Sequence, residues 1–449
     1  MTHRRDQALA TLNEVRQALQ APRPPRPQRN LASQSRSNAG SFDRLPEFEE
    51  LRIKRALGDI AGISNPFHRV HDGRASQTTV IQGREVVNFS SYDYLGLNGH
   101  PEVGAAAKRA IDAYGTSVSA SRLSAGERPI HRQLESALAR LHQCEDALAF
   151  VSGHATNVSV IGSLLGPKDL IICDSVIHNS VIEGARLSGA RRILVPHGDL
   201  EAFERALRLN RGRHPRALVV VEGLYSMDGD IPDLPALVSL KERYDAWLMV
   251  DEAHSIGVLG ATGRGIAEEQ GVPPAQVDIW MGTLSKSLAS AGGYIAGSQV
   301  LIDILKYTTP GFVYSVGLPA PVAAAALQAY ELMVAEPQRL NSLRSNGSYF
   351  LAAAKSRGLN VGTSIGASII PVIVGDSPSA VILSERLLAR GFNVVPAIFP
   401  GVPENEARLR FFVTSEHRRD QLDAALDAVV EELAEIRKGP SFVKRVADR

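Results

Sequence analysis

Three polar side chains of different chemistry stand just after short apolar runs of the sequence. They are the carboxyl of Asp251, the imidazole of His254 and the amine of Lys286. Apolar runs of this length are typical of strands buried in a parallel sheet, and in such sheets functional groups collect at the carboxyl ends of the strands. A carboxylate, an imidazole and an amine at neighbouring strand ends predict an active site.

Lys286 has the most informative surroundings, because Thr283, Ser285 and Ser287 flank it with hydroxyl groups. Burial lowers the pKa of a lysine and frees its neutral amine, which can then form a Schiff base with an aldehyde. The hydroxyls and nearby backbone N–H groups can receive phosphate oxygens. A Ser-Lys-Ser segment on its own is more often a solvated loop. Together with the acidic strand end at Asp251, however, these residues are the parts that a pyridoxal phosphate site needs.

Three other segments could contribute to such a site. Val151–Asn157 follows an apolar run and contains glycine and small residues, which let backbone N–H groups at a helix N-terminus approach an anion. His178 follows another apolar run, and by itself is best interpreted as a surface histidine. Arg410 alternates with apolar residues and shares a strand face with Arg408. This pattern fits either an exposed strand face or a guanidinium that grips a substrate carboxylate.

Composition excludes several other classes of protein. The segment Asp251–His254, Asp-Glu-Ala-His, is also the acidic box of some helicases, but that function requires a GxxxxGK[ST] loop and the chain has no Gly-Lys dipeptide. The formal net charge of +1 does not favour nucleic acid or an anionic membrane as a partner. Two cysteines are too few for a disulfide framework, and no metal site is predicted. We expect a cytoplasmic enzyme without a membrane span.

The apolar patterns predict how the chain is organised. Residues 1–40 form an extension rich in Arg and Pro, and 41–100 an N-terminal segment. Helical stripes alternate with strand-length runs between 101 and 335, which predicts a large α/β domain. Residues 336–449 read as a smaller α+β domain. The predicted strands are Ala147–Val151, Leu170–Cys173, Arg192–Val195, Ala217–Val221, Trp247–Val250, Ile279–Met281, Ile369–Val374 and Leu409–Val413.

In their order along the chain, the motifs resemble those of the α-oxoamine synthases, pyridoxal-phosphate enzymes of fold type I. Each motif is weak alone, but the ordered set over residues 88–416 is specific. The resemblance implies a large, mostly parallel seven-stranded sheet domain, a smaller C-terminal α+β domain, and a homodimer with its active site at the interface. The matching segments are Asn88–Leu97, Gly153–Asn157, Glu222–Asp230, Asp251–Ser255, Gly263–Gly265, Thr283–Ser287, Leu318–Pro319 and Arg408–Arg410.

The resemblance also implies roles for individual side chains. Lys286 would bind pyridoxal phosphate covalently and then act as base and acid at the substrate Cα. Asp251 would pair with the ring nitrogen, and His178 would stack on the ring face. His254 would reach the phenolic oxygen, with Ser226 nearby. Gly153, His154, Thr283 and Ser285 would contact the phosphate. The remaining cofactor residues would be Ser152 and, from the neighbouring subunit, Ser315. Substrate would contact Tyr92 and, through its carboxylate, Arg410.

The implied reaction is a decarboxylative Claisen condensation. A small amino acid (serine, alanine or glycine) would combine with an acyl thioester to give an α-amino ketone, CO₂ and a free thiol. Tyr92 replaces the asparagine of many family members and is similar to serine palmitoyltransferases, which favours long acyl chains. Gly126–His131 looks like the synthase domains attached to polyketide synthases. We therefore expect an acyl carrier protein as donor, in preference to coenzyme A, with residues 1–40 as a docking element.

Three alternatives remain open at this point. One is the 8-amino-7-oxononanoate synthase of biotin synthesis, a member of the same family. Another is an aminotransferase of the same fold, which would release a keto acid and no CO₂. The third is a catalytically silent scaffold, which the presence of Lys286, Asp251, His178 and Arg410 disfavours.

Overall fold

The uninterrupted apolar runs form one central sheet in the structure, a computed structural model that describes residues 41–61 and 64–439. Its strands lie in the order β3-β9-β8-β7-β6-β4-β5, and within this sheet β9 runs antiparallel to both of its neighbours. This confirms the mostly parallel seven-stranded sheet. The strands are β3 (Asp146–Phe150), β4 (Leu170–Asp174), β5 (Arg191–Val195), β6 (Ala217–Glu222), β7 (Trp247–Asp251), β8 (Ile279–Thr283) and β9 (Gly293–Gly297).

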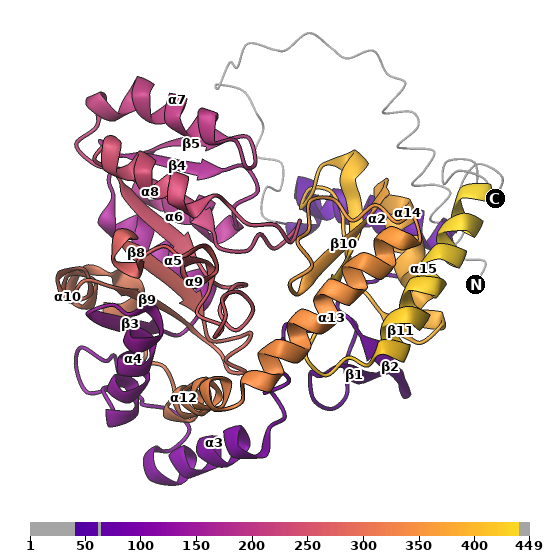
Figure 1. Cartoon of the computed structure of the whole chain (residues 1–449), viewed down its shortest axis with the longest axis horizontal. Helices are drawn as coiled ribbons and strands as arrows, with labels where there is room; N and C mark the ends of the chain where they lie inside the picture. The colour runs from indigo at the N-terminus through magenta and orange to yellow at the C-terminus, as the bar shows by residue number, and fades with distance from the viewer. Residues whose placement is uncertain (1–40, 62–63, 440–449) are drawn as a thin grey trace.

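Side chains along the central strands alternate between two hydrophobic cores, one on each face of the sheet. In β7, Leu248 and Val250 belong to one core and Met249 belongs to the other. Strands that are apolar at every position need an apolar layer on both sides, and helices supply these layers (Figure 1). The core around Met249 takes side chains from α5 (Gly153–Leu164), α6 (Asn179–Ser188) and α10 (Gln299–Thr308). The other takes them from α3 (Pro101–Tyr114), α4 (Pro129–His142), α7 (Leu200–Asn210), α8 (Leu234–Arg243) and α12 (Ala320–Ala335).

A smaller lobe has a hydrophobic core of its own, around the antiparallel strands β10 (Ile369–Gly375), β13 (Ala407–Phe412) and β12 (Pro396–Ala397). Figure 1 shows helix α13 running from the large lobe into this one. The predicted domain division at 335 falls between α12 and α13 and stays a prediction. The helices of the lobe are α13 (Pro337–Ser356), α14 (Ser377–Ala389) and α15 (Arg419–Lys438).

The N-terminal segment joins the smaller lobe through a third sheet. Strand β2 (Arg84–Asn88) pairs antiparallel with β1 (Thr78–Ile81) and parallel with β11 (Phe392–Asn393), which follows α14. Residues near Asn88 are thereby placed between the two lobes, where Tyr92 can reach the large sheet. The remaining elements are the helices α2 (Pro46–Ala61), α9 (Ile266–Gln270) and α11 (Pro310–Val313), and the short 3-10 helices Phe42–Arg44, Arg211–Arg213, Pro274–Gln276 and Glu404–Glu406.

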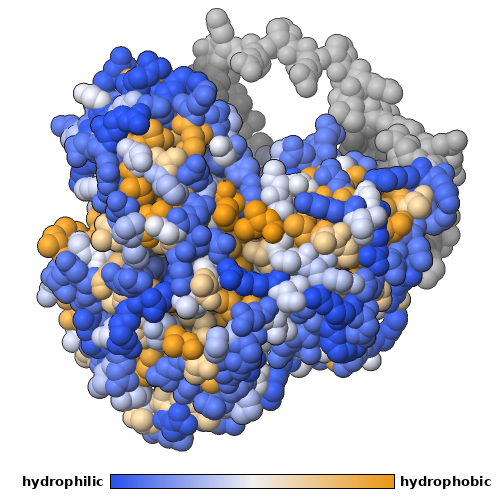
Figure 2. All heavy atoms as spheres, in the orientation of Figure 1, coloured by the Kyte–Doolittle hydropathy of each residue, from blue (hydrophilic) through white to orange (hydrophobic). Residues whose placement is uncertain are grey.

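Figure 2 shows hydrophilic side chains over most of one face, with apolar residues in small separate patches. Within the ranges that the structure describes, no helix has both the length and the apolar character needed to cross a bilayer. The predicted extension, residues 1–40, lies outside those ranges.

Candidate active site

A cavity of about 340 Å³ opens at the carboxyl ends of the central strands β6, β7 and β8. Its wall brings together side chains that are far apart in the sequence, as the parallel sheet requires. Every sequence-predicted site residue lies in this wall except Ser315. The predicted residues in the wall are Tyr92, Ser152, Gly153, His154, His178, Ser226, Asp251, His254, Thr283, Ser285, Lys286 and Arg410.

Lys286 projects into the cavity from the turn that follows β8. Its Nζ lies 5.5 Å from the centroid of the Tyr92 ring. Burial lowers the pKa of Lys286 to about 8, although the nearby carboxyls of Asp251 and Glu222 oppose that shift. A lysine with this pKa is partly neutral near pH 7.5, and the neutral amine is the form that attacks an aldehyde.

This lowered pKa gives the first prediction. The cofactor-free protein should capture pyridoxal phosphate covalently at a rate that rises about tenfold per pH unit below pH 8 and levels off above it, because the neutral fraction of Lys286 rises in that way. Stopped-flow absorbance at several pH values measures the rate. A rate that kept rising to pH 10, as for an exposed lysine, would contradict the prediction.

Asp251 ends β7 and is held in a fixed orientation. Its Oδ2 accepts a hydrogen bond from Nδ2 of Asn157 at 2.9 Å, and its Oδ1 accepts one from the backbone N of Ala253 at 3.0 Å. The side chain is buried, with 4% of the residue exposed. A buried carboxylate that already has two donors keeps its remaining lone pairs for a partner in the cavity, such as a protonated ring nitrogen.

Asn157 links Asp251 to His178. The same Nδ2 also donates to Oγ of Ser180 at 2.9 Å, and that hydroxyl lies 2.7 Å from Nδ1 of His178. The result is a hydrogen-bonded chain of four side chains from β7, α5 and the start of α6. Asn157 belongs to the matching segment Gly153–Asn157, but no role was predicted for it. The available signal was its position one helical turn after Gly153, which places both residues on one face of α5.

Glu222 is a second carboxyl beside Asp251, and it was not among the predicted site residues. The two residues are paired in the register of the parallel strands β6 and β7. Oε2 of Glu222 accepts the backbone N–H of Ser226 at 3.1 Å, whereas its buried Oε1 has no partner among the described residues. Burial and the neighbouring Asp251 raise the pKa of Glu222 to about 8. Glu222 is therefore mostly protonated at pH 7.

His254 is fixed from behind by Tyr94. The Tyr94 hydroxyl lies 2.7 Å from Nδ1 of His254, and both side chains are buried. Burial, with the charge of Lys286 as a second cause, holds the pKa of His254 well below 6.5. The imidazole is therefore neutral, and its Nε2 is the nitrogen that remains for a group in the cavity.

The start of α5 forms an anion cradle with the end of β8. Ser152 is the N-cap of α5, and its hydroxyl accepts the backbone N–H of Ala155. The hydroxyls of Thr283 and Ser285 lie 2.7 Å apart at the same edge of the cavity. A Cβ on Gly153 would lie 2.9 Å from Oγ1 of Thr283, so the close approach of helix and strand requires glycine here. This donor set of helix N–H groups and hydroxyls fits a phosphate.

The two arginines of β13 have different environments. Nη1 of Arg410 donates to the carbonyl of Ser226 at 2.9 Å, and the guanidinium lies 5.1 Å from the Phe412 ring centroid, facing the cavity. Arg408 is buried, and it pairs with Asp228 and Glu406. An exposed strand face with two arginines is therefore wrong, because Arg408 is used inside the protein and Arg410 remains for a ligand.

Ser315 lies away from this cavity. Its exposed hydroxyl donates to the carbonyl of Val316 at 3.1 Å, and the neighbouring Tyr314 is 86% exposed. A contribution of Ser315 to the site of a second subunit stays a prediction.

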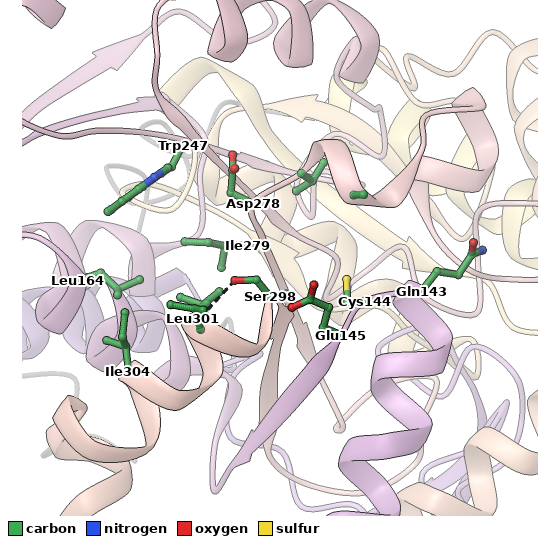
Figure 3. Close-up of a pocket in the computed structure, with 14 residues that line it drawn as sticks. Gln143, Cys144, Glu145, Leu164, Trp247, Asp278, Ile279, Ser298, Leu301 and Ile304 are labelled. Atoms are coloured by element: carbon green, nitrogen blue, oxygen red, sulfur yellow. Dashed lines mark hydrogen bonds between the residues drawn. The ribbon is translucent and has the colours of Figure 1, made fainter.

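A second cavity, of about 410 Å³, lies near the amino ends of β7 and β8, at the other end of these strands from the first cavity (Figure 3). Its wall includes Trp247, Cys144, Leu301 and the carboxyls of Glu145 and Asp278, but no lysine, arginine or histidine of the described residues. Burial raises the pKa of the Cys144 thiol to about 11, so the sulfur is not a nucleophile at neutral pH. The groups that could do chemistry line the first cavity, at the carboxyl ends of the strands.

Comparison with known proteins agrees with this geometry. The model of the family "aminotransferase class I and II" matches residues 84–429. The chain is 42% identical to a putative 8-amino-7-oxononanoate synthase of Desulforudis audaxviator, over 79% of this chain and 91% of that protein. It is 39% identical to 8-amino-7-oxononanoate synthase 1 of Bacillus velezensis, over 78% of this chain and 88% of that protein. A solved serine palmitoyltransferase of Sphingomonas wittichii is similar with a TM-score of 0.83 and 31% identity, over 89% of this chain and all of that one.

The chain belongs to the α-oxoamine synthase family. The synthase is a pyridoxal-phosphate-dependent acyltransferase of fold type I, and it condenses a small amino acid with an acyl thioester. The family identification and the cofactor expected from the sequence are both confirmed.

Proposed function

We propose that this α-oxoamine synthase binds its amino acid between Lys286 and Arg410 and releases an α-amino ketone, CO₂ and a thiol. One observation carries the proposal. A single cavity contains a lysine of lowered pKa, a carboxylate with fixed orientation, and the guanidinium of Arg410. A carboxylate clamp and a base on opposite sides of a substrate hold its Cα at the base.

Pyridoxal phosphate, when bound, supplies an electron sink for negative charge at the amino-acid Cα. The residues of the cavity fit this group. Thr283, Ser285 and the N-terminus of α5 would hold the phosphate, and Asp251 would keep a proton on the ring nitrogen. Neutral His254 would donate to the phenolic oxygen. Lys286 would bind the aldehyde carbon and, once an amino acid has displaced it, take a proton from Cα and return one after CO₂ has left.

Arg410 is the proposed binding group for the amino-acid carboxylate. We expect R410K to raise KM for the amino acid about 10- to 100-fold, because lysine cannot form two parallel hydrogen bonds to a carboxylate, a difference of about 1.5–3 kcal/mol. Steady-state kinetics at saturating thioester measures the change, with R109K on the exposed surface of α3 as control. An R410K enzyme with an unchanged KM would remove Arg410 from this role.

The names of the curated relatives suggest a first substrate pair. In 8-amino-7-oxononanoate, the last two carbons and the amino group are what remains of alanine after it loses its carboxyl. The other seven carbons then come from a dicarboxylic acyl thioester. Alanine with a seven-carbon acyl group is therefore the first pair to test. Serine with a long-chain acyl group is the second, and Tyr92 together with the likeness to serine palmitoyltransferase structures favours it.

The acyl donor and the assembly are further parts of this proposal. Acyl groups would arrive on an acidic carrier protein, with the Arg-rich residues 1–40 as its docking element. The synthase would act as a homodimer in the cytoplasm, with Ser315 of each subunit at the site of the other.

The deciding experiment is a product panel. Purified enzyme with pyridoxal phosphate is given alanine, serine or glycine with seven-carbon or long-chain acyl groups, each on carrier protein and on coenzyme A. Mass spectrometry should find one α-amino ketone and an equal amount of CO₂. A keto acid without CO₂ would instead identify an aminotransferase. Equal rates with both carriers, unaffected by deletion of residues 1–40, would contradict the carrier-protein part.

A further inference from the structure

His197, in the loop between β5 and α7, lies between two carboxylates outside the cavity. Its Nδ1 is 3.0 Å from both oxygens of Asp174, and its Nε2 is 3.0 Å from Oδ2 of Asp230. An ionised carboxylate only accepts hydrogen bonds, so each ring nitrogen must carry a hydrogen. The geometry therefore describes an imidazolium held by two anions. In agreement, the hydrogen bonds to Asp174 and Asp230 outweigh burial and raise the pKa of His197 to about 10.

Asp174 shapes the turn that presents His178. It is the last residue of β4 and is fully buried. Its Oδ1 accepts the backbone N–H of Val176 at 2.9 Å, and its carbonyl accepts that of Ile177 at 3.2 Å. His178 is the next residue, so the position of the Asp174 carboxylate sets where that imidazole enters the cavity.

Asp230 closes the loop that carries Ser226. Its carbonyl accepts the backbone N–H of Tyr225 at 2.9 Å, and its Oδ2 accepts the hydroxyl of Thr363, which precedes β10 of the smaller lobe, at 2.8 Å. The carbonyl of Ser226 in turn holds Arg410. The Asp230 carboxylate therefore fixes a loop that orients the proposed substrate clamp.

We propose that His197 is a positioning residue of the active site: as a cation between Asp174 and Asp230, it fixes the two turns that present His178 and the Ser226 carbonyl to the cavity. The charged and titratable groups that face it are these two aspartates and Tyr225, whose ring packs edge-on at 4.5 Å. Without the cation, the buried carboxylate of Asp174 and the partly buried carboxylate of Asp230 would repel each other, and the turns would separate.

We expect H197N to affect only the two turns and the amino-acid affinity, and we expect a second substitution, D230N, to restore most of that affinity. In the cofactor-free protein, amide hydrogen exchange should become faster in residues 174–178 and 222–230, because both turns lose their common anchor. In the loaded enzyme, the apparent Kd for the amino acid, read from the visible absorption of the cofactor, should rise about tenfold. The double variant H197N/D230N removes one of the repelling charges and should recover affinity to within about threefold of wild type.

The matched control is H214N. His214 is also in the large lobe, and its Nδ1 lies 2.8 Å from the carbonyl of Lys168, away from the cavity. It should change neither exchange in the two turns nor affinity. If H197N lowers only the melting temperature, with both turns and the Kd unchanged, His197 is merely structural and the proposal is overturned. A double variant as weak as H197N would also overturn it.

The role of His197 rests on the proposed function in one respect: the affinity measurement assumes that the cavity binds an amino acid. The exchange measurement needs neither cofactor nor thioester. If the product panel yields no amino ketone while exchange and affinity change as described, the proposed function fails and the positioning role stands. If the panel yields an amino ketone while exchange and affinity in H197N stay unchanged, the proposed function stands and the positioning role fails.

Discussion

Replacing Lys286 with alanine should lower kcat for amino-ketone formation by at least about 10⁴-fold. The variant loses both the amine that binds the aldehyde and the base that moves the Cα proton. These losses fall on the same step, so they do not add as independent effects. Borohydride reduction followed by mass spectrometry should label wild-type Lys286 and leave the variant unlabelled. Circular dichroism should be unchanged, because the side chain points into a cavity.

The control for this experiment is K108A, on the exposed surface of α3. K108A also removes a lysine amine, but Lys108 does not line the cavity, so kcat should stay within about twofold of wild type. Borohydride labelling of K286A at another lysine, or amino-ketone formation at more than a hundredth of the wild-type rate, would show that a different amine does the chemistry.

The large sheet could be predicted from the sequence because its parallel strands are built on runs of apolar residues, although the edge strand β5 begins with the exposed Arg191 and Arg192. One strand, β9, was missed. Its segment, Gly-Tyr-Ile-Ala-Gly, begins with a residue that weakens β-propensity. The structure shows why glycine is there: a Cβ on Gly293 would lie 2.5 Å from Oγ1 of Thr156 and 2.6 Å from Cα of Gly153. A close approach of the strand to α5 selects this residue, and such an approach is a tertiary fact that local sequence does not reveal.

Some residues of the candidate site could likewise be predicted from the sequence, and others could not. Asp251 and Lys286 could be predicted because each directly follows a recognisable strand or turn, and their chemistry is distinctive. Asn157 and Glu222 were missed as site residues, since an asparagine on a helix and a glutamate at a strand end have many ordinary interpretations. Their importance appears only when register and packing place both of them against the Asp251 carboxylate.

The hydrogen bonds that fix the Asp251 carboxylate toward the cavity give the second large expected effect. D251N should lower kcat about 10²- to 10³-fold, the usual loss when a fixed charge that stabilises a transition state is removed. An amide at this position can no longer keep the ring nitrogen protonated. The visible spectrum of the bound cofactor should change accordingly, while binding of the phosphate at the N-terminus of α5 is retained.

E222Q is the matched control, because it changes the neighbouring carboxyl of the same register pair. With a pKa of about 8, raised by burial and by Asp251, Glu222 is mostly neutral at pH 7. Glutamine is also neutral, so kcat at pH 7 should stay within about threefold of wild type. Above pH 8, Glu222 ionises in the wild-type enzyme and places a second negative charge beside Asp251, whereas E222Q does not titrate. The two enzymes should therefore differ more at pH 9 than at pH 7. If E222Q is as impaired as D251N at pH 7, Glu222 is the charged partner and the division of roles between the two carboxyls is wrong.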